Sequence, residues 1–232
     1  MYMDVAAAMN DDSKKWDQIH QKLHKIDQDH SLFAEGCEKS FPRGSIVCDL
    51  GGGTGNDVLY FLKSGHGVIL LDLSEFALKT AQHRAQEVKL VDRLVIQQVD
   101  FGLHTLPLKD ASIDIAYSRI ALNYFGHRHT TKIIKDIWRT LKTGGHAYLA
   151  FKSPKDGREM ERLLRNAVEY EPGVYIEAGQ LRSRFTVDQL KTIAGNAGIP
   201  NCQVFENEEI LGMSAGGQKQ ILYQNVMSFT KV

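Results

Sequence analysis

Short runs of hydrophobic residues alternate with segments of helical spacing through the middle of the chain. Four runs rich in Val, Ile and Leu predict buried strands, and they begin at Ile46, Gly67, Leu94 and Ser112. The stretch at 57–62, directly after the first run, has the character of a helix. Because strand and helix follow one another as far as Phe151, the sequence predicts an α/β, doubly wound fold with helices on both faces of a parallel sheet.

The two ends of the chain carry different patterns. Hydrophobic spacings of three and four within 12–26 predict an amphipathic helix, in which Trp16 either packs the helix onto the core or helps to close a site. Residues 31–40 are expected to form a second helix. Near the other end, 201–210 and 218–230 are strand-like and joined by a short glycine-rich link, so they are expected to pair antiparallel.

Three more helices are predicted in the later part of the chain. Hydrophobic residues from 133 to 141 have helical spacing, and Gly144-Gly145 is expected to end that helix before a strand at 146–151. Residues 158–169 and 187–196 predict the other two helices.

The most specific feature is the glycine-rich turn after the first predicted strand. Asp49 opens the pattern D-x-G-x-G-x-G, whose glycines are Gly51, Gly53 and Gly55. Without β-carbons these residues can adopt positive φ and let a ligand approach the main chain closely. A dinucleotide site needs G-x-G-x-x-G, but Asn56 stands where its third glycine belongs. The turn therefore predicts a cofactor site that is not an NAD site.

Acidic residues end the next two predicted strands. Asp72 follows Gly55 by 17 residues, and its carboxylate is suited to accept hydrogen bonds from ribose hydroxyls. The alternative for Asp72 is a helix cap, a role that Ser74 fills better. Asp100 ends the third strand, where it is either a ligand-binding acid or a turn residue before Gly102.

These landmarks together resemble class I S-adenosylmethionine-dependent methyltransferases. The segment Arg139-Thr140-Leu141-Lys142-Thr143-Gly144-Gly145 is similar to their R-x-L-K-P-G-G turn, with Thr143 in place of the usual proline. The resemblance implies a Rossmann-like, seven-stranded sheet with a final antiparallel strand. It also implies S-adenosyl-L-methionine as cofactor and S-adenosyl-L-homocysteine as product.

The resemblance assigns roles to individual residues. It implies that Asp100 bonds the adenine amino group, that the Phe101 N–H meets a ring nitrogen, and that Asp72 holds the ribose. The whole cofactor-binding set that we expect is Asp49, Gly51, Gly53, Gly55, Asn56, Asp72, Leu73, Asp100, Phe101, Ser118 and Arg119. By position after the fourth strand, Tyr124, His127 and His129 are the candidates for a catalytic base.

The region after the fourth strand also bears on the acceptor. It lacks N-P-P-Y, the form used on planar amino groups of bases and glutamine amides, and instead resembles the small-molecule and tellurite-resistance-like branch. The segment at 182–186 is similar to the Y-R-R-F segment of that branch. Its Arg182 and Arg184 either enter the pocket, where a planar fork suits a carboxylate or phosphate, or lie at the surface.

Composition narrows the class of protein further. The 232 residues carry 28 basic and 28 acidic side chains, with no run of Lys and Arg, so electrostatic capture of nucleic acid is not expected. The three cysteines have no C-x-x-C spacing, and the start of the chain lacks the pattern of a signal peptide. We therefore expect a cytoplasmic protein with no membrane segment. We also expect no metal site, because the helix around His20 and His24 offers mostly a solvated face.

Domain organisation follows from the same assignment. Residues 1–44 are expected to form an N-terminal helical segment covering the cofactor site, and 45–232 the methyltransferase domain. The core fold does not require 152–186, which is the expected acceptor cap. The predicted function is in-line methyl transfer to a small molecule; the alternatives are an RNA or protein methyltransferase, or a non-catalytic S-adenosylmethionine-binding module.

Overall fold

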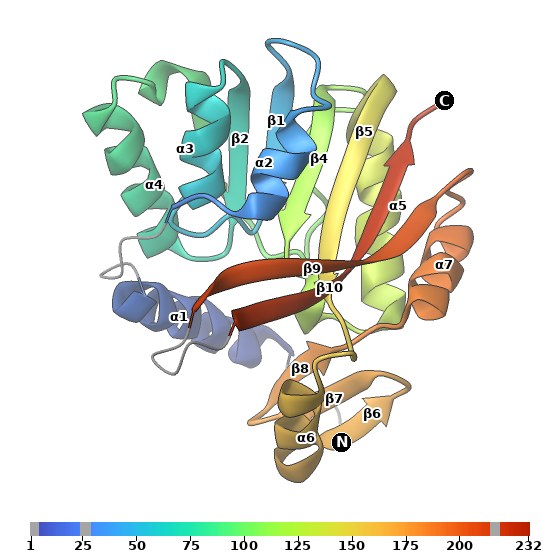
Figure 1. The fold of residues 1–232 in the computed structure, drawn as a ribbon. Coiled ribbons are helices and arrows are strands. Elements are labelled where there is room, and N and C mark those ends of the chain that lie inside the picture. Colours follow the sequence, from blue (N-terminus) through green and yellow to red (C-terminus); the bar gives the residue numbers. More distant parts are fainter. Residues whose placement is uncertain (1–4, 24–28, 214–218) are drawn as a thin grey trace. The chain divides into compact units, whose positions relative to one another are not determined.

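The computed structural model describes residues 5–23, 29–213 and 219–232, and it divides into two compact units between Asp100 and Phe101 (Figure 1). Three residues named in the predictions lie outside the described residues: His24 and Ile26 of the helix predicted at 12–26, and Gln218 of the strand predicted at 218–230. Among the described residues, no helix is both long and apolar enough to cross a membrane.

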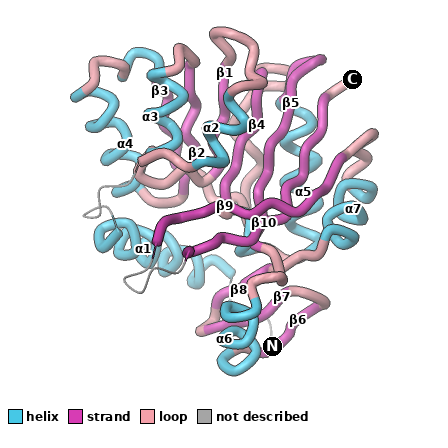
Figure 2. The backbone as a smooth tube through the Cα atoms, in the orientation of Figure 1, coloured by secondary structure: helices cyan, strands magenta, loops and turns pink. Residues whose placement is uncertain are grey.

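The first unit is built on three parallel strands. β1 pairs with β2 from Ile46 opposite Gly67, and β2 pairs with β3 from Val68 opposite Leu94, so the order is β3-β2-β1 (Figure 2). Fully buried Leu50, Leu70 and Leu71 from these strands form the centre of the core. The elements of this unit are α1 (Val5–Leu23), α2 (Leu32–Glu38), β1 (Ile46–Leu50), α3 (Asn56–Lys63), β2 (Gly67–Asp72), α4 (Glu75–Glu87), the 3-10 helix η1 (Val91–Arg93) and β3 (Leu94–Gln98).

The second unit contains a four-stranded run and a smaller sheet. β4 and β5 are parallel, whereas β10 is antiparallel to both β5 and β9. β6, β7 and β8 form a separate antiparallel sheet. The elements are β4 (Ile113–Arg119), η2 (Leu122–Tyr124), α5 (His127–Thr140), β5 (Leu141–Lys152), α6 (Gly157–Asn166), β6 (Val168–Glu171), β7 (Val174–Glu177), β8 (Gln180–Ser183), α7 (Val187–Asn196), β9 (Gln203–Met213) and β10 (Lys219–Thr230).

The strand order β3-β2-β1-β4-β5-β10-β9 confirms the predicted fold class. The predicted antiparallel pair near the end of the chain is present as β9 and β10, and the predicted helix at 187–196 has the bounds of α7. Thr186 caps that helix, since its side chain accepts from the Gln189 N–H while the Gln189 side chain accepts from the Thr186 N–H.

Two sequence predictions in the second unit are wrong. The helix expected to end at Gly144-Gly145 ends at Thr140, because Leu141 is already extended and pairs with Ile113. The glycine pair instead lies inside β5 beside a register shift, where a Cβ on Gly145 would lie 3.0 Å from the Asp114 carbonyl oxygen. The helix expected at 158–169 ends at Asn166, and residues 168–171 form β6.

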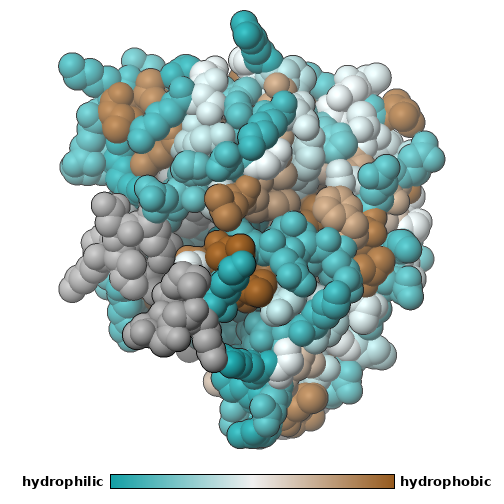
Figure 3. Space-filling model, in the orientation of Figure 1, coloured by the Kyte–Doolittle hydropathy of each residue, from teal (hydrophilic) through white to brown (hydrophobic). Residues whose placement is uncertain are grey.

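The segment at 152–186 folds into α6 and the sheet β6-β7-β8. Its surface is mainly hydrophilic at the bottom of the space-filling view, interrupted by a few hydrophobic side chains (Figure 3). The exposed hydrophobic residues of this segment are Leu164, Val168, Tyr170 and Ile176. Four-residue strands with mixed polar and apolar positions give only a weak periodic signal, so the sequence did not predict this sheet.

Arg139, the arginine of the R-x-L-K motif, fastens the loop before β4. It donates to the carbonyl oxygens of Leu106 at 3.0 Å and Leu108 at 2.8 Å, and it forms ion pairs with Asp110 and Asp136 at 2.6 Å each. Burial lowers the pKa of Arg139, but hydrogen bonds and charge from the two carboxylates outweigh it and raise the pKa. One guanidinium therefore holds loop and helix together.

We predict that Arg139→Lys destabilises the protein. An ammonium keeps the charge but cannot reach two carbonyls and two carboxylates at once, so the free energy of unfolding should fall by about 1–2 kcal/mol. Urea denaturation followed by circular dichroism measures this change. Lys135→Arg, an exchange of the same residue types at an exposed position of α5, is the matched control; equal stability of both variants would contradict the role of Arg139.

Candidate cofactor and acceptor sites

The glycine turn between β1 and α3 has the backbone that its sequence predicts. Gly51, Gly53 and Gly55 have φ of 74°, 57° and 84°, which are left-handed values that favour glycine. Gly52 does not need positive φ, but a Cβ there would overlap the carboxylate of Asp49. Sequence reasoning missed this role of Gly52, although the unbroken run of three glycines signals it.

Asp49 is buried beneath this turn and has an oxygen without a partner in the described structure. The residue is 2% exposed, and its Oδ2 atom accepts no hydrogen bond. Burial, followed by the charges of Asp57 and Asp72, raises the pKa of Asp49 well above its usual value. The uncharged carboxyl is therefore favoured until a positively charged group, such as a sulfonium or an ammonium group, lies beside it and stabilises the carboxylate.

Asp72 ends β2 with both carboxylate oxygens held by backbone N–H groups. Gly53 donates to Oδ2 at 2.9 Å, Ser74 donates to Oδ1 at 2.8 Å, and the residue is 6% exposed. Burial raises the pKa of Asp72, and the N–H groups and His20 oppose that rise. The cap of α4 is Ser74, whose Oγ accepts from the Ala77 N–H at 3.0 Å, so Asp72 is not needed as a cap.

Helix α1 packs against the same turn within the first unit. The His20 ring lies over Gly53, where a Cβ would come within 2.9 Å of the His20 Cε1 atom. Asp17 accepts from the Ser74 hydroxyl at 2.5 Å and from the Phe76 N–H at 3.1 Å. The expectation that His20 lies on a solvated face is therefore wrong. Among the residues that the structure describes, no His, Cys, Asp and Glu cluster could hold a metal ion.

Asp72 and Asp100 come from the carboxyl ends of neighbouring strands. Asp72 pairs with Gln98, and the Val99 N–H donates to the Asp72 carbonyl oxygen at 3.0 Å. Asp100 follows directly and is half-buried. The first unit thus places Asp72 against the glycine turn and Asp100 two residues beyond the end of the neighbouring strand β3.

Arg84 is a further residue at the turn that no sequence motif indicated. It comes from α4, and one of its terminal nitrogens donates to the Thr54 carbonyl oxygen at 2.9 Å and to the Asn56 side chain at 2.6 Å. Asn56, a predicted cofactor residue, is therefore positioned by Arg84. The sequence hides this contact because the two residues are 28 positions apart and α4 carries many other polar side chains.

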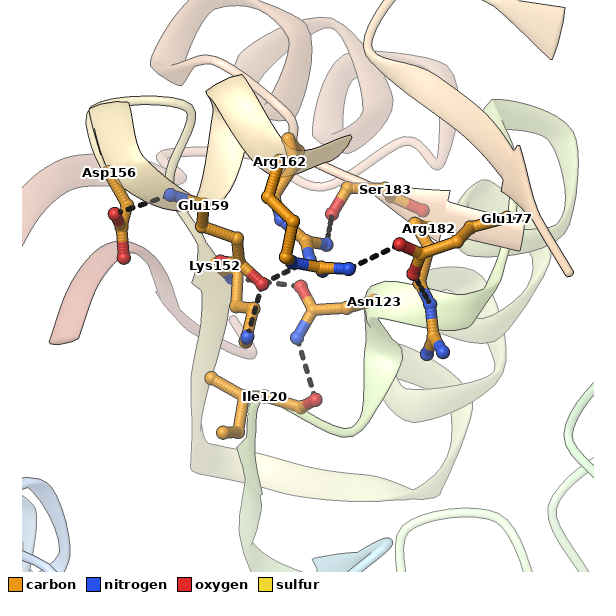
Figure 4. A network of polar contacts seen from close by, with 10 residues as sticks. Ile120, Asn123, Lys152, Asp156, Glu159, Arg162, Glu177, Arg182 and Ser183 are labelled. Carbon is orange, nitrogen blue, oxygen red and sulfur yellow. Dashed lines mark hydrogen bonds and ion pairs between the residues drawn. The ribbon is translucent and has the colours of Figure 1, made fainter. Parts of the chain in front are cut away.

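In the second unit, a buried asparagine shapes the loop after β4. Ile120 has φ of 52°, a strained value for a β-branched residue. Asn123 is 2% exposed, donates to the Ile120 carbonyl oxygen at 2.6 Å and accepts from the Lys152 N–H at 2.8 Å. These contacts hold the strained turn (Figure 4), and Tyr124 follows Asn123 in the chain. No sequence motif indicated this role of Asn123.

The predicted residues at the end of β4 lie in different surroundings. Ser118 is 1% exposed, and Arg119 donates to the Glu209 carboxylate through two nitrogens, at 2.9 and 2.8 Å. Glu209 also accepts from Gln224 at 2.9 Å. The Arg119 side chain is thus engaged by Glu209 of β9, and its contact with the cofactor stays a prediction.

The three candidate catalytic residues have different contacts. Tyr124 is half-buried, and burial raises its pKa against the opposing charges of Arg182 and Arg184. His127 begins α5, with its ring 4.7 Å from the Phe185 ring and its Nε2 atom 2.8 Å from the Pro172 carbonyl oxygen. His129 is exposed and lines a pocket of about 140 Å³ together with the loop that begins at Phe101.

Arg182 and Arg184 are both bound to carboxylates of the segment 152–186. Arg184 is 4% exposed and pairs with Glu159 at 2.7 Å, so surface placement is wrong for this residue. Arg182 is partly exposed, pairs with Glu177 at 3.3 Å and has its guanidinium carbon 5.0 Å from the centre of the Tyr124 ring. Figure 4 shows the pair of Arg182 with Glu177.

Comparisons with known proteins identify the family. A family model described as a methyltransferase domain matches residues 47–145. The ubiquinone/menaquinone biosynthesis C-methyltransferase UbiE of Acidiphilium cryptum is 32% identical over 190 residues, which cover 78% of this chain and 68% of that protein. The chain belongs to the S-adenosyl-L-methionine-dependent methyltransferases. The predicted cofactor, S-adenosyl-L-methionine with S-adenosyl-L-homocysteine as product, is that of the family.

Other relatives match over less of their length. Sarcosine/dimethylglycine N-methyltransferase of Aphanothece halophytica is 32% identical over 108 residues, and this match covers 46% of the chain but 38% of that protein. Among solved structures, 1,6-didemethyltoxoflavin-N1-methyltransferase of Burkholderia thailandensis, with its substrate and S-adenosylhomocysteine bound, has a TM-score of 0.70 at 18% identity, covering 99% of this chain and 89% of that chain. A TehB-like methyltransferase of Corynebacterium glutamicum has a TM-score of 0.57 at 16% identity, covering 98% and 100%. These structures share the class I fold.

We predict that Arg84→Gln weakens cofactor binding. Loss of the guanidinium frees the Thr54 carbonyl and the Asn56 side chain, so the dissociation constant for S-adenosyl-L-homocysteine should rise about tenfold. Titration calorimetry gives the constant, and thermal melting checks that the fold persists. Lys79→Gln removes a like charge from an exposed position of the same helix and should leave affinity unchanged. An Arg84 variant that binds as tightly as the control would contradict the positioning role.

Proposed function

We propose that this protein transfers a methyl group from S-adenosyl-L-methionine to a small-molecule acceptor. The observation that carries the proposal is the arrangement around the glycine turn, where Asp72 is held by two N–H groups and Asp49 keeps a buried, unsatisfied oxygen. The sulfonium supplies an activated methyl group, so the residues of the protein need only bind and align the two reactants.

Each predicted cofactor residue is assigned a part in binding. The Asp72 carboxylate accepts the ribose hydroxyls, Asp100 with the Phe101 N–H receives adenine, and Asp49 balances positive charge beside the turn. The remaining proposed contacts are Gly51, Gly53, Gly55, Asn56, Leu73, Ser118 and Arg119. Helix α1, which already packs on the turn, supports the proposal that residues 1–44 cover the cofactor.

The second unit is assigned the acceptor, with 152–186 as its cap. Because the pKa of Tyr124 is raised, its hydroxyl stays protonated at neutral pH and suits hydrogen bonding to the acceptor better than proton removal. His127 and His129 are the bases for an acceptor that must lose a proton. Arg182 and Arg184 are the proposed contacts to an acidic group of the acceptor.

The small-molecule class is supported by the sequence and by the relatives. The loop after β4 lacks N-P-P-Y, the charge is balanced, and the names of several relatives specify small molecules, among them sarcosine and dimethylglycine. Transfer to RNA or protein, and cofactor binding without turnover, are the competing functions that the following experiment separates.

The test uses methyl-labelled S-adenosyl-L-methionine and a cell extract. We expect label in molecules of low mass that nuclease and protease do not alter. Label in nuclease-sensitive or protease-sensitive material would replace the small-molecule class with RNA or protein. Tight cofactor binding with no transfer into any fraction would support a binding module. An Asp72→Ala variant is the control for label that does not depend on this site.

A further inference from the structure

The cap segment places two carboxylates between four cationic side chains. Glu159 accepts from Lys152 and Arg184, each at 2.7 Å. Glu177 accepts from Arg182 at 3.3 Å and from Arg162. Each carboxylate thus balances one of its two cations, and the two groups together keep an excess of two positive charges (Figure 4). A positive excess in partly buried surroundings favours a bound anion.

The four cations differ in what they can offer to a ligand. Arg184 lies in the interior, where it also donates to the Ser183 carbonyl oxygen at 2.7 Å. Lys152 is committed to Glu159, and Arg162 lies at the outer side with its side chain 51% exposed. Arg182 is intermediate, with its side chain 22% exposed. Lys152 is also intermediate, with its side chain 28% exposed, but its contact with Glu159 at 2.7 Å is shorter than that of Arg182 with Glu177 at 3.3 Å.

The Arg182 guanidinium is held in one orientation, but Glu177 binds only its Nε atom. Glu177 takes its Nε atom at the long distance of 3.3 Å, and Tyr124 lies beneath it as a hydrogen-bonding and aromatic neighbour. Figure 4 shows the two terminal nitrogens pointing away from Glu177. Burial raises the pKa of Glu177, but hydrogen bonds and charge from Arg162 and Arg182 outweigh it and lower the pKa, so Glu177 stays ionised and continues to orient Arg182.

We propose that Arg182 binds a carboxylate of the methyl acceptor, which makes the acceptors small molecules that carry a carboxylate group. Two terminal N–H donors in one plane match the two oxygens of a carboxylate. Tyr124, held against the same guanidinium, then lies beside the bound molecule. Glu177 acts as a positioning residue for Arg182. This inference deepens the proposed function and rests on it.

The first test asks whether acceptors need a carboxylate. The small-molecule fraction of a cell extract is divided in three: one part is untreated, one is amidated with a carbodiimide and ammonium chloride, and one is treated with phosphatase. We expect label in the untreated and phosphatase-treated parts and a loss of most label after amidation. Transfer that survives amidation, or that phosphatase abolishes, would overturn the carboxylate assignment and leave methyl transfer intact. No transfer to the untreated part would remove the proposed function, and this inference with it.

The second test asks whether Arg182 is the contact. With the untreated fraction in a dilution series, Arg182→Gln should raise the half-saturating amount of acceptor about tenfold or more, because a hydrogen-bonded charge is lost. Its dissociation constant for S-adenosyl-L-homocysteine should not change. Arg182→Lys should restore part of the affinity.

Arg162→Gln is the matched control, since Arg162 pairs with the same Glu177 from the outer side. If Arg182 binds the acceptor, Arg162→Gln leaves half-saturation near that of the wild type. If Arg182 serves only to pair with Glu177, the two glutamine variants lose activity alike and the proposal is wrong. Thermal melting of both variants separates either result from unfolding.

Discussion

The burial of the Asp72 carboxylate at the end of β2 is the constraint on which the first unit depends. A carboxylate at 6% exposure needs donors, and the chain supplies them from two sides, through the Gly53 N–H of the turn and the Ser74 N–H at the start of α4. One side chain therefore fixes the turn and the helix start. Helix α1 is attached to the same helix start, because Asp17 accepts hydrogen bonds from the Ser74 hydroxyl and the Phe76 N–H.

The second unit depends on polar side chains that hold irregular backbone. Asn123 stabilises the left-handed Ile120, and Arg139 ties the loop before β4 to α5. Glu171 of β6 accepts from the first N–H of α5, at His127, at 2.7 Å. Strain and unpaired backbone groups would otherwise cost about 1–3 kcal/mol each, so these contacts keep the loop around Tyr124 in one conformation.

The parts of the structure that the sequence predicted are those with a local cause. Periodicity located the strands that begin at Ile46 and Gly67, and the glycine spacing located a turn with positive φ. Asp72 was expected to end a strand, and it is the last residue of β2. The helix at 187–196 was predicted at its observed bounds, since Thr186 and Gln189 form a capping box within four residues.

The parts that the sequence could not predict depend on distant partners. Arg84 reaches Thr54 across 30 positions, and Arg184 reaches Glu159 across 25. No window of sequence contains both members of such a pair. The role of Gly144-Gly145 was predicted wrongly because their local signal is ambiguous: glycine is favoured both at a helix C-terminus and in a bulged strand. Only the pairing of Leu141 with Ile113 shows that the pair lies in a strand.

Titration calorimetry of S-adenosyl-L-homocysteine against the wild type and Asp72→Asn is the most direct test of whether the buried carboxylate holds the cofactor. Asparagine keeps the size of the side chain but replaces one acceptor oxygen with a donor and removes the charge. We expect the dissociation constant to rise about a hundredfold, because two charge-assisted hydrogen bonds to the ribose are weakened. Equal affinity in a variant with unchanged thermal melting would contradict the assignment of Asp72 and, with it, the proposed site.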